Sequence, residues 1–163
     1  MTFCLPPPLN SVSLGICMDL NVQKPFKWGI IEGPYEIASY CVAENSNLLI
    51  ILNAWLESPE DIGEDSAWTT MNYWAHRLKP LWEQREGISV NDQRGTNVVV
   101  CNRTGSENGE SRVSSLCGGT GVVRNTGQKF CGSSCNFQMS NSGEPRLKHA
   151  MGKDEEGINV WTV

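Results

Sequence analysis

The chain has 163 residues, a formal net charge of −5 and 39% hydrophobic residues. This length suits one domain with its own core or part of a larger one, and the composition is that of a globular protein. The sequence lacks the concentrated basic cluster that nucleic acid requires, so we expect no nucleic-acid partner. Its longest apolar run, 48–52, is far too short to cross a membrane.

The cysteine content favours a reducing compartment. The first ten residues have neither the basic start nor the apolar core of a secretory signal. Without such a signal we expect free thiols and a cytoplasmic location. The later cysteines lack the paired spacing of ordinary zinc sites, so no metal is expected. The seven cysteines are Cys4, Cys17, Cys41, Cys101, Cys117, Cys131 and Cys135.

The first half of the chain predicts an α/β fold. Residues 1–11 are expected to form an irregular lead-in because they contain three consecutive prolines. Residues 12–16 alternate in polarity like a strand, and 35–44 carry apolar residues four apart like a helix. The run 48–52 is typical of a strand covered on both faces. Strand, helix and strand in this order form a βαβ unit.

The second half predicts one more helix and several strands. A helix is expected at 66–78, and 97–101 resembles a second buried strand. Residues 106–129 are rich in Gly, Ser and Asn and are interpreted as a flexible insertion. The apolar stripe of the helix is expected to comprise Trp68, Met71, Ala75, Leu78 and Trp82. Further strands are expected at 130–139, 146–151 and 158–163.

Cys17 is the candidate nucleophile. It directly follows the first predicted strand, within "GICMDLN" at 15–21. Ligands of α/β sheets bind at the carboxyl ends of strands. A thiol there needs a base, a cation or a helix N-terminus to form its thiolate. From the residues alone, a buried structural cysteine remains the alternative.

Four further residues have open roles near this edge. Asp19 either fixes the turn after Cys17 through backbone N–H groups or contacts substrate. Asn53 and Trp55 follow the second strand, where they would line a substrate site, although Trp55 could equally fill the core. Arg103 is expected to pair with a carboxylate and hold a corner near the site rather than to contact substrate.

Several motifs, taken in order, resemble the nitrilase superfamily of carbon–nitrogen hydrolases. "GICMDLN" resembles the nucleophile motif, and "NAWL" at 53–56 resembles the segment after the next strand. "CNRTG" at 101–105 is similar to the Asn-Arg-x-Gly corner, which assigns Asn102 and Arg103 structural roles near the site. "FCGSSC" at 130–135 resembles a later strand of the family. The resemblance covers residues 12–163 apart from the insertion.

The resemblance implies an αββα sandwich and covalent catalysis without a cofactor. A cysteine thiolate attacks an amide carbon, ammonia leaves, and water hydrolyses the thioester; Cys17 matches this nucleophile. The family also uses a Glu base and a Lys that precede the cysteine. The 16 residues before Cys17 contain no Asp, Glu, Lys, Arg or His. We therefore expect a truncated chain, lacking the N-terminal strands and helices, and a nearly inactive site.

The implied function is deamidation. Together with "GINVWTV" at 157–163, the sequence motifs resemble in particular those of the fungal hydrolases that deamidate N-terminal Asn or Gln of proteins in the N-degron pathway. Another nitrilase-type amidase stays open. A catalytically dead fragment that binds a partner through an unpaired sheet edge stays open too, as does a homo-oligomer. Weaker candidates for the missing base and cation are Lys24, Lys27, Glu32 and Glu36.

Overall fold

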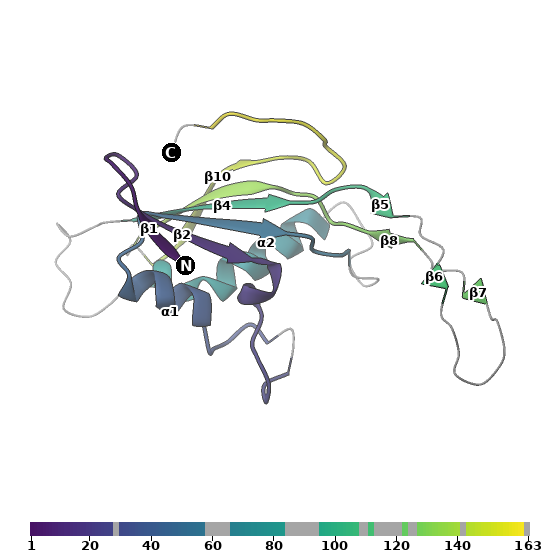
Figure 1. Ribbon diagram of the computed structural model, residues 1–163, viewed down its shortest axis with the longest axis horizontal. Coiled ribbons are helices and arrows are strands. Elements are labelled where there is room, and N and C mark those ends of the chain that lie inside the picture. Colours follow the sequence, from purple (N-terminus) through teal and green to yellow (C-terminus); the bar gives the residue numbers. More distant parts are fainter. Residues whose placement is uncertain are drawn as a thin grey trace.

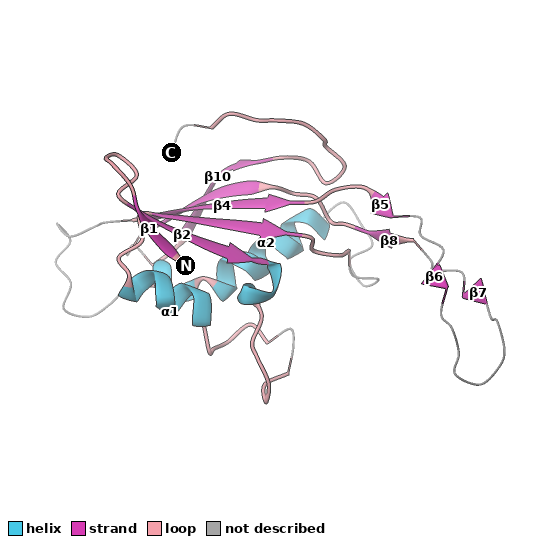
Figure 2. Cartoon of the chain, viewed as in Figure 1, coloured by secondary structure: helices cyan, strands magenta, loops and turns pink. Residues whose placement is uncertain are grey.

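A computed structural model describes residues 1–27, 30–57, 66–83, 95–107, 111–112, 122–123, 127–140 and 143–161. Within these residues the predicted α/β class is confirmed: a six-stranded sheet packs against two α-helices (Figures 1 and 2). The helices are α1 (Glu36–Ala43) and α2 (Ser66–Arg77). The sheet strands are β1 (Thr2–Cys4), β2 (Ser11–Ile16), β3 (Leu48–Asn53), β4 (Thr96–Asn102), β9 (Cys135–Met139) and β10 (Pro145–Ala150).

The sheet has a parallel centre and antiparallel edges. Its strand order is β1-β2-β3-β4-β9-β10. β3 pairs in parallel with both β2 and β4, whereas β1, β9 and β10 each pair antiparallel with their neighbours. Because β2, β3 and β4 run the same way, their carboxyl ends meet at one edge of the sheet. That edge carries Cys17, Asn53 and Asn102.

One face of the sheet forms the core with both helices. Cross-strand rows on this face include Ile51, Val100 and Cys135, and, one step along, Leu49, Val98 and Phe137. α1 contributes Ile37, Ala38 and Cys41, α2 contributes Met71, Trp74 and Ala75, and Leu78 directly after α2 completes the set. Figure 1 shows both helices on the same side of the strands.

The predicted stripe of α2 is partly wrong. Met71, Ala75 and Leu78 are buried as expected, but Trp68 is 54% exposed. Trp74, which the stripe did not include, is fully buried instead. At 100° per residue Trp74 and Trp68 flank the stripe on opposite sides, and the docking angle on the sheet buries only the Trp74 flank.

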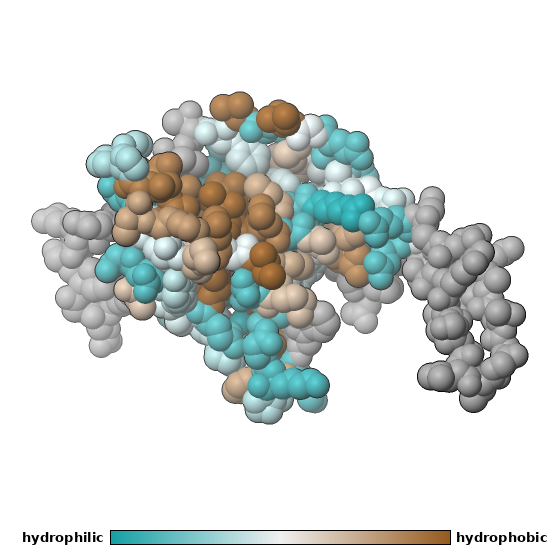
Figure 3. Space-filling view, in the orientation of Figure 1, coloured by the Kyte–Doolittle hydropathy of each residue, from teal (hydrophilic) through white to brown (hydrophobic). Residues whose placement is uncertain are grey.

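The other face of the sheet carries an exposed apolar surface. Ile16, Leu52 and Cys101 form one cross-strand row on this face, and Ile16 and Leu52 are 59% and 57% exposed. The next row is Leu14, Ile50 and Val99. Figure 3 shows apolar residues gathered over this region of the strands. We call these six residues the open face. The prediction that β3 is covered on both faces is therefore wrong for the described residues.

Three local predictions also differ from the structure. A short strand, β1, lies within the expected irregular lead-in and pairs with β2. The strand expected from 130 begins only at Cys135, because Gly132 and Ser133 have φ of +53° and +60° and cannot continue a strand. Residues 158–161 form no strand, since no neighbouring strand pairs with them; residues 162–163 lie outside the described residues.

The predicted insertion is described only in part. β5 (Ser106–Glu107) pairs with β8 (Gln128–Lys129), and β6 (Ser111–Arg112) pairs with β7 (Val122–Val123). The rest of 106–129, including Cys117, lies outside the described residues apart from residue 127. The six described cysteines are free thiols. Among the helices of the described chain, none has the length and apolarity to span a membrane.

Candidate functional site

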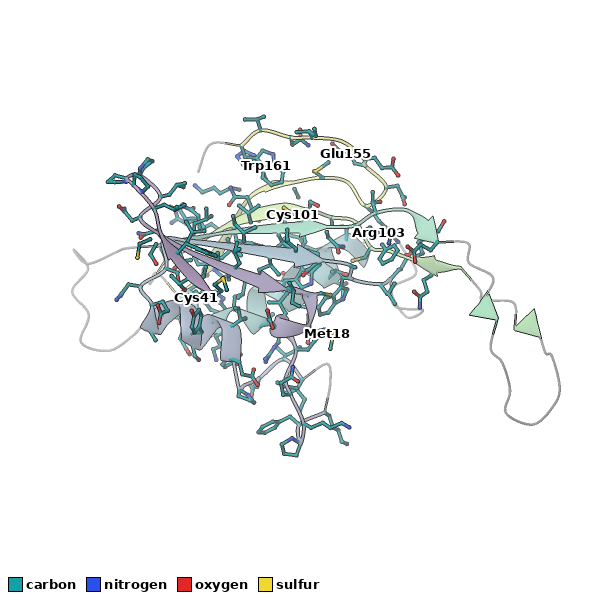
Figure 4. All side chains as sticks on the ribbon, viewed as in Figure 1. Met18, Cys41, Cys101, Arg103, Glu155 and Trp161 are labelled. Carbon is teal, nitrogen blue, oxygen red and sulfur yellow. The ribbon has the colours of Figure 1, made fainter. Side chains whose placement is uncertain are left out.

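Cys17 and Asn53 lie at the carboxyl ends of adjacent parallel strands. The last residues that β2 and β3 pair with each other are Ile16 and Leu52. Cys17 and Asn53 directly follow this pair, and Asn53 still pairs with Asn102 of β4. Neighbouring strands are about 4.8 Å apart. Figure 4 labels Met18, the residue after Cys17, at the end of β2. Ligands of α/β sheets bind at this edge, which makes it the candidate site.

Asp19 holds the turn that presents Cys17. Residues Cys17–Leu20 form a single turn of 3₁₀-helix directly after β2. The Asp19 carboxylate Oδ2 accepts a hydrogen bond from the Ile16 N–H at 2.8 Å. This contact closes the turn back onto the strand, which is the first of the two roles predicted for Asp19. Its contact with substrate stays a prediction.

Arg77 anchors the segment that follows the turn. Its side chain is fully buried at the end of α2 and donates to three backbone carbonyls between 20 and 34. Nε donates to Leu20 O at 2.7 Å, and Nη2 donates to Pro34 O at 2.6 Å. Nη1 reaches Ile31 O at 3.4 Å. A buried guanidinium satisfied by several carbonyls ties this loop to the core.

Arg77 also has charged and aromatic neighbours. The Glu36 carboxylate lies 3.6 Å from Nη2, and the guanidinium carbon lies 5.2 Å from the centroid of the Tyr35 ring. Glu36 was a weaker candidate for the missing base. Its pairing with Arg77 gives this carboxylate a structural partner instead.

An aromatic cluster backs the site from α2. The Trp55 ring lies 5.4 Å from the Tyr73 ring and 6.1 Å from the Trp74 ring. The Tyr73 hydroxyl donates to Asn21 Oδ1 at 2.8 Å, which links the cluster to the segment after the Cys17 turn. Burial raises the pKa of Tyr73 above its ordinary value of 10.0. Trp55 is half-buried and packs against the core.

Asn102 organises the corner after β4. Its Oδ1 accepts from the Trp55 N–H at 2.9 Å, and its Nδ2 donates to Gly132 O at 2.6 Å. Its backbone N–H donates to Ser134 Oγ at 2.9 Å, while that hydroxyl lies 3.1 Å from the Asn102 carbonyl oxygen. One side chain therefore joins the segments after β3, β4 and β8, as the predicted structural role near the site requires.

Arg103 lies in the same corner: its N–H donates to Asn53 O at 3.1 Å, and its carbonyl accepts from the Gly132 N–H at 3.1 Å. It pairs with the Glu107 carboxylate, and both side chains are half exposed. Its guanidinium carbon lies 4.4 Å from the centroid of the Phe130 ring. A carboxylate pair of the predicted kind is present. Asn102 holds the corner through its side chain, and Arg103 contributes through its backbone.

A charged cluster lies along the same edge. Glu57 pairs with Lys153, and its carboxylate also lies 3.5 Å from Lys129 Nζ. Asp154 lies 3.4 Å from the same Lys129 ammonium. The hydrogen bond from Lys153 and the two positive charges hold the pKa of Glu57 below its ordinary value of 4.5. These four residues join the C-terminal segment to the loop after β3 and to the end of β8.

The buried cysteines are unsuited to nucleophilic chemistry. Burial raises the pKa of Cys41 and, more strongly, that of Cys135. Partial desolvation also raises the pKa of Cys101, although this residue is exposed on the open face. Cys17 is partly exposed at the strand edge. Within the part of the chain that the structure describes, no side chain hydrogen-bonds to its Sγ. Lys24, Lys27 and Glu32 are exposed there and do not contact it.

Sequence reasoning missed Arg77 and Tyr73. A usable signal existed for Arg77: it is the only charged residue in α2, Ser66–Arg77, whereas a solvent-facing helix normally carries several. Tyr73 offered no comparable signal, because its partner Asn21 is 52 positions away. Among the described residues, no group of three or more His, Cys, Asp or Glu side chains could hold a metal ion.

Comparisons with known proteins found similarity among solved structures only. No protein-family model matches the chain, and no curated protein matches it. Among solved structures, the chain is similar to a carbon–nitrogen hydrolase from Helicobacter pylori G27, at 16% sequence identity and a TM-score of 0.47. The match covers 91% of this chain and 39% of that one. The chain therefore spans about two fifths of the length of the structure that it matches.

Proposed function

We propose that these residues form the thiol-bearing part of a nitrilase-type amidase with Cys17 as nucleophile. One observation carries the proposal: Cys17 follows β2 at the carboxyl edge of the parallel strands, beside Asn53 of β3. The order of the motifs at 15–21, 53–56 and 101–105 supports the same assignment. In this reading the sheet and its helices are half of an αββα sandwich, and the open face would contact the other half.

The proposed reaction is hydrolysis of a linear amide through a thioester. The Cys17 thiolate attacks the amide carbon, and a C–S bond forms. The C–N bond then breaks, and nitrogen leaves as ammonia after taking a proton. Water attacks the thioester carbon, the C–S bond breaks, and a carboxylic acid and the free thiol result. No cofactor enters these steps.

The proposed substrates are proteins or peptides with N-terminal Asn or Gln. The residues of the motifs support these substrates over other amides. A thiol nucleophile requires a reducing compartment, so we place the reaction in the cytoplasm, where it would feed an N-degron pathway. Asn53 and Trp55 are proposed to contact the substrate, because both follow β3 directly. Asp19 closes the turn after Cys17 and is also proposed to contact the substrate.

The proposal also needs a base and a cation. A cysteine near its free pKa is only a few per cent thiolate at neutral pH. General acid–base catalysis contributes roughly 10²–10⁴-fold, and an oxyanion donor a further factor of about 10²–10³. Since no described side chain meets Cys17 Sγ, we expect little turnover from the 163 residues alone. A Glu and a Lys supplied in frame upstream of Met1 would restore it.

The test compares two proteins on the same peptides. The 163-residue chain and a chain extended by any open frame upstream of Met1 are incubated with peptides bearing N-terminal Asn, N-terminal Gln or internal Asn. Ammonia release and mass spectrometry report deamidation. We expect the extended protein to convert only the N-terminal residues, and Cys17→Ala to abolish this. Cys101→Ala, an exposed thiol on the open face, is the matched control.

Two results would contradict the proposal. Deamidation that survives Cys17→Ala would remove Cys17 as nucleophile. Absence of an upstream frame encoding both a Glu and a Lys would remove the source of the missing groups. The alternative of a partner bound at a sheet edge is less favoured, because β1 has only three residues and β10 shifts register between Leu147 and His149. Short and irregular edges discourage strand pairing.

A further inference from the structure

Asn53 carries two buried polar atoms without a partner. Its side chain is only 7% exposed at the end of β3, yet neither Nδ2 nor Oδ1 makes a hydrogen bond in the structure. An unpaired buried donor or acceptor costs about 1–3 kcal/mol. Such groups are rare in native proteins and each calls for a reason, of which a functional role is one.

The position of Asn53 suggests that reason. It continues the row of Leu49 and Ile51, whose side chains face the helices. It also directly follows Leu52, the pairing partner of Ile16, and therefore lies beside Cys17. The unpaired amide is thus on the strand next to the candidate nucleophile and at the same edge of the sheet.

The surroundings fix Asn53 in place. Its backbone carbonyl accepts from the Arg103 N–H at 3.1 Å, and its Cα partner on β4 is Asn102, whose own side chain is fully engaged. On α2, the Trp74 indole N–H is a second buried donor without a partner, and its ring packs on Trp55. The backbone of Asn53 is therefore hydrogen-bonded within the fold, while its side-chain amide is left unbonded.

A carboxamide is the chemical group that complements this side chain. The two polar atoms of Asn53 are one N–H₂ donor and one carbonyl acceptor. A substrate carboxamide offers an acceptor to Nδ2 and a donor to Oδ1 at the same time. A carboxylate has no donor and would leave Oδ1 unpaired. A site built to bond both groups rejects the analogue that lacks one of them.

We propose that Asn53 is a specificity-determining residue that binds the carboxamide of the substrate and distinguishes it from the carboxylate of the product. This inference deepens the proposed function and rests on it. Amide-to-amide pairing beside Cys17 would hold the scissile carboxamide near the thiol. It would also weaken retention of the acid that hydrolysis yields. Asn53 is left unpaired in the protein because its partner is the substrate.

The first test measures how Cys17 distinguishes two alkylating reagents. Iodoacetamide carries a carboxamide and iodoacetate carries a carboxylate. Peptide mass spectrometry gives the alkylation rate at Cys17 with each reagent, and exposed Cys4 in the same molecule supplies the intrinsic ratio. We expect Cys17 to prefer iodoacetamide beyond the Cys4 ratio. Asn53→Leu should reduce this extra preference by roughly fivefold, the effect of about one hydrogen bond.

The second test uses stability as an independent readout. Asn53→Leu keeps the approximate shape and removes both unpaired atoms, so it should raise the urea midpoint or leave it unchanged. A purely structural Asn would lower the midpoint when replaced. Asn136 on β9 is the matched control, because it is equally buried and also carries an unpaired Oδ1, but lies two strands away from β3. Asn136→Leu should not alter alkylation at Cys17.

The outcomes separate this inference from the proposed function. An unchanged reagent preference in Asn53→Leu, or a lowered urea midpoint, overturns the role of Asn53. If Asn53→Leu fails to fold, Asn53→Asp takes its place. It retains the shape of the side chain and removes the donor, so it must also lower the preference of Cys17 for iodoacetamide. Activity of the extended enzyme that survives Cys17→Ala overturns the proposed function. Deamidation that depends on Cys17 but not on Asn53 overturns only the role of Asn53.

Discussion

The Arg77 guanidinium donates a 2.7 Å hydrogen bond to the Leu20 carbonyl, which lies three residues after Cys17 and 57 residues before Arg77. Through this bond and the one to Pro34, α2 holds both ends of the loop that follows the candidate nucleophile. The loop has no regular structure of its own between η1 (Cys17–Leu20) and α1 in its described part. Arg77 is therefore a main anchor of this loop, together with the Tyr73 hydrogen bond to Asn21.

Replacing Arg77 by Met is expected to destabilise the protein by about 2–4 kcal/mol, because buried carbonyls lose their donors. Arg77→Lys should recover part of this loss, since an ammonium cannot reach all three carbonyls. Urea denaturation followed by circular dichroism measures the change. Lys79→Met, a change at a partly exposed ion pair with Glu83, is the control and should have little effect. Equal loss in both variants would contradict the anchoring role.

Gly132 should tolerate no side chain. A β-carbon there would lie 1.9 Å from the Lys153 carbonyl oxygen, and the residue has φ of +53°. Gly132→Ala therefore combines strain with a backbone clash, and we expect a loss above about 3 kcal/mol. Gly143→Ala separates the two causes: its φ is +88° but nothing lies within 4 Å of the β-carbon. It should lose only about 1–2 kcal/mol in urea titrations.

Glu57 should make stability depend on pH in the acid range. Because its pKa lies below 4.5 in the folded protein, its contribution is fully present above the unfolded pKa. The contribution is lost as pH falls through the lowered folded value. The difference in unfolding free energy between wild type and Glu57→Gln should be constant above about pH 5 and shrink below it.

Lys153→Met supplies the control for this pH dependence. Lys153 is the first cause of the lowered pKa, through its hydrogen bond to Glu57. In a Lys153→Met background, adding Glu57→Gln should produce a much smaller pH-dependent difference. Urea titrations of the four proteins at a series of pH values give the comparison. An unchanged difference in that background would show that another group supplies it.

The open face should promote self-association of the 163-residue chain. Exposed apolar patches of this kind are sites of association, and Ile16 and Leu52 are its most exposed members within the sheet. The double variant Ile16→Thr, Leu52→Thr should lower the binding of a hydrophobic dye and the association seen by light scattering. Ile158→Thr, Val160→Thr is the matched control, since these residues are almost fully exposed away from the sheet. Equal effects would contradict a specific role for the face.

Local patterns predicted most of the elements that position the site. Alternation predicted β2, spacing of four predicted α1, and a continuous apolar run predicted β3. The same run led to the wrong prediction that both faces of β3 are covered. A strand that is apolar at nearly every position does not show which of its faces is buried. Only the packing of α1 and α2 on Leu49 and Ile51 distinguishes that face from the row of Leu52.

The candidate site was predictable only in part. Asn102 was assigned to a corner by its motif, but its three-way connection depends on residues brought together from separate loops. Tyr73 and Trp74 meet Trp55 because of the way α2 crosses the sheet. No periodicity in the sequence encodes that crossing. The side chains that surround a site come from several segments, and their meeting is a property of packing.

The sequence by itself determined that a thiol follows a strand at Cys17, and it offered a turn role for Asp19 as one of two, because both depend on contacts within a few residues. The tertiary structure decided what lies beside that thiol. Parallel register places Asn53 next to Cys17, and docking of α2 brings Arg77 to Leu20. The physical reason is the distance along the chain: residues 36 or 57 positions apart come together only after the core has fixed the strands and helices in place.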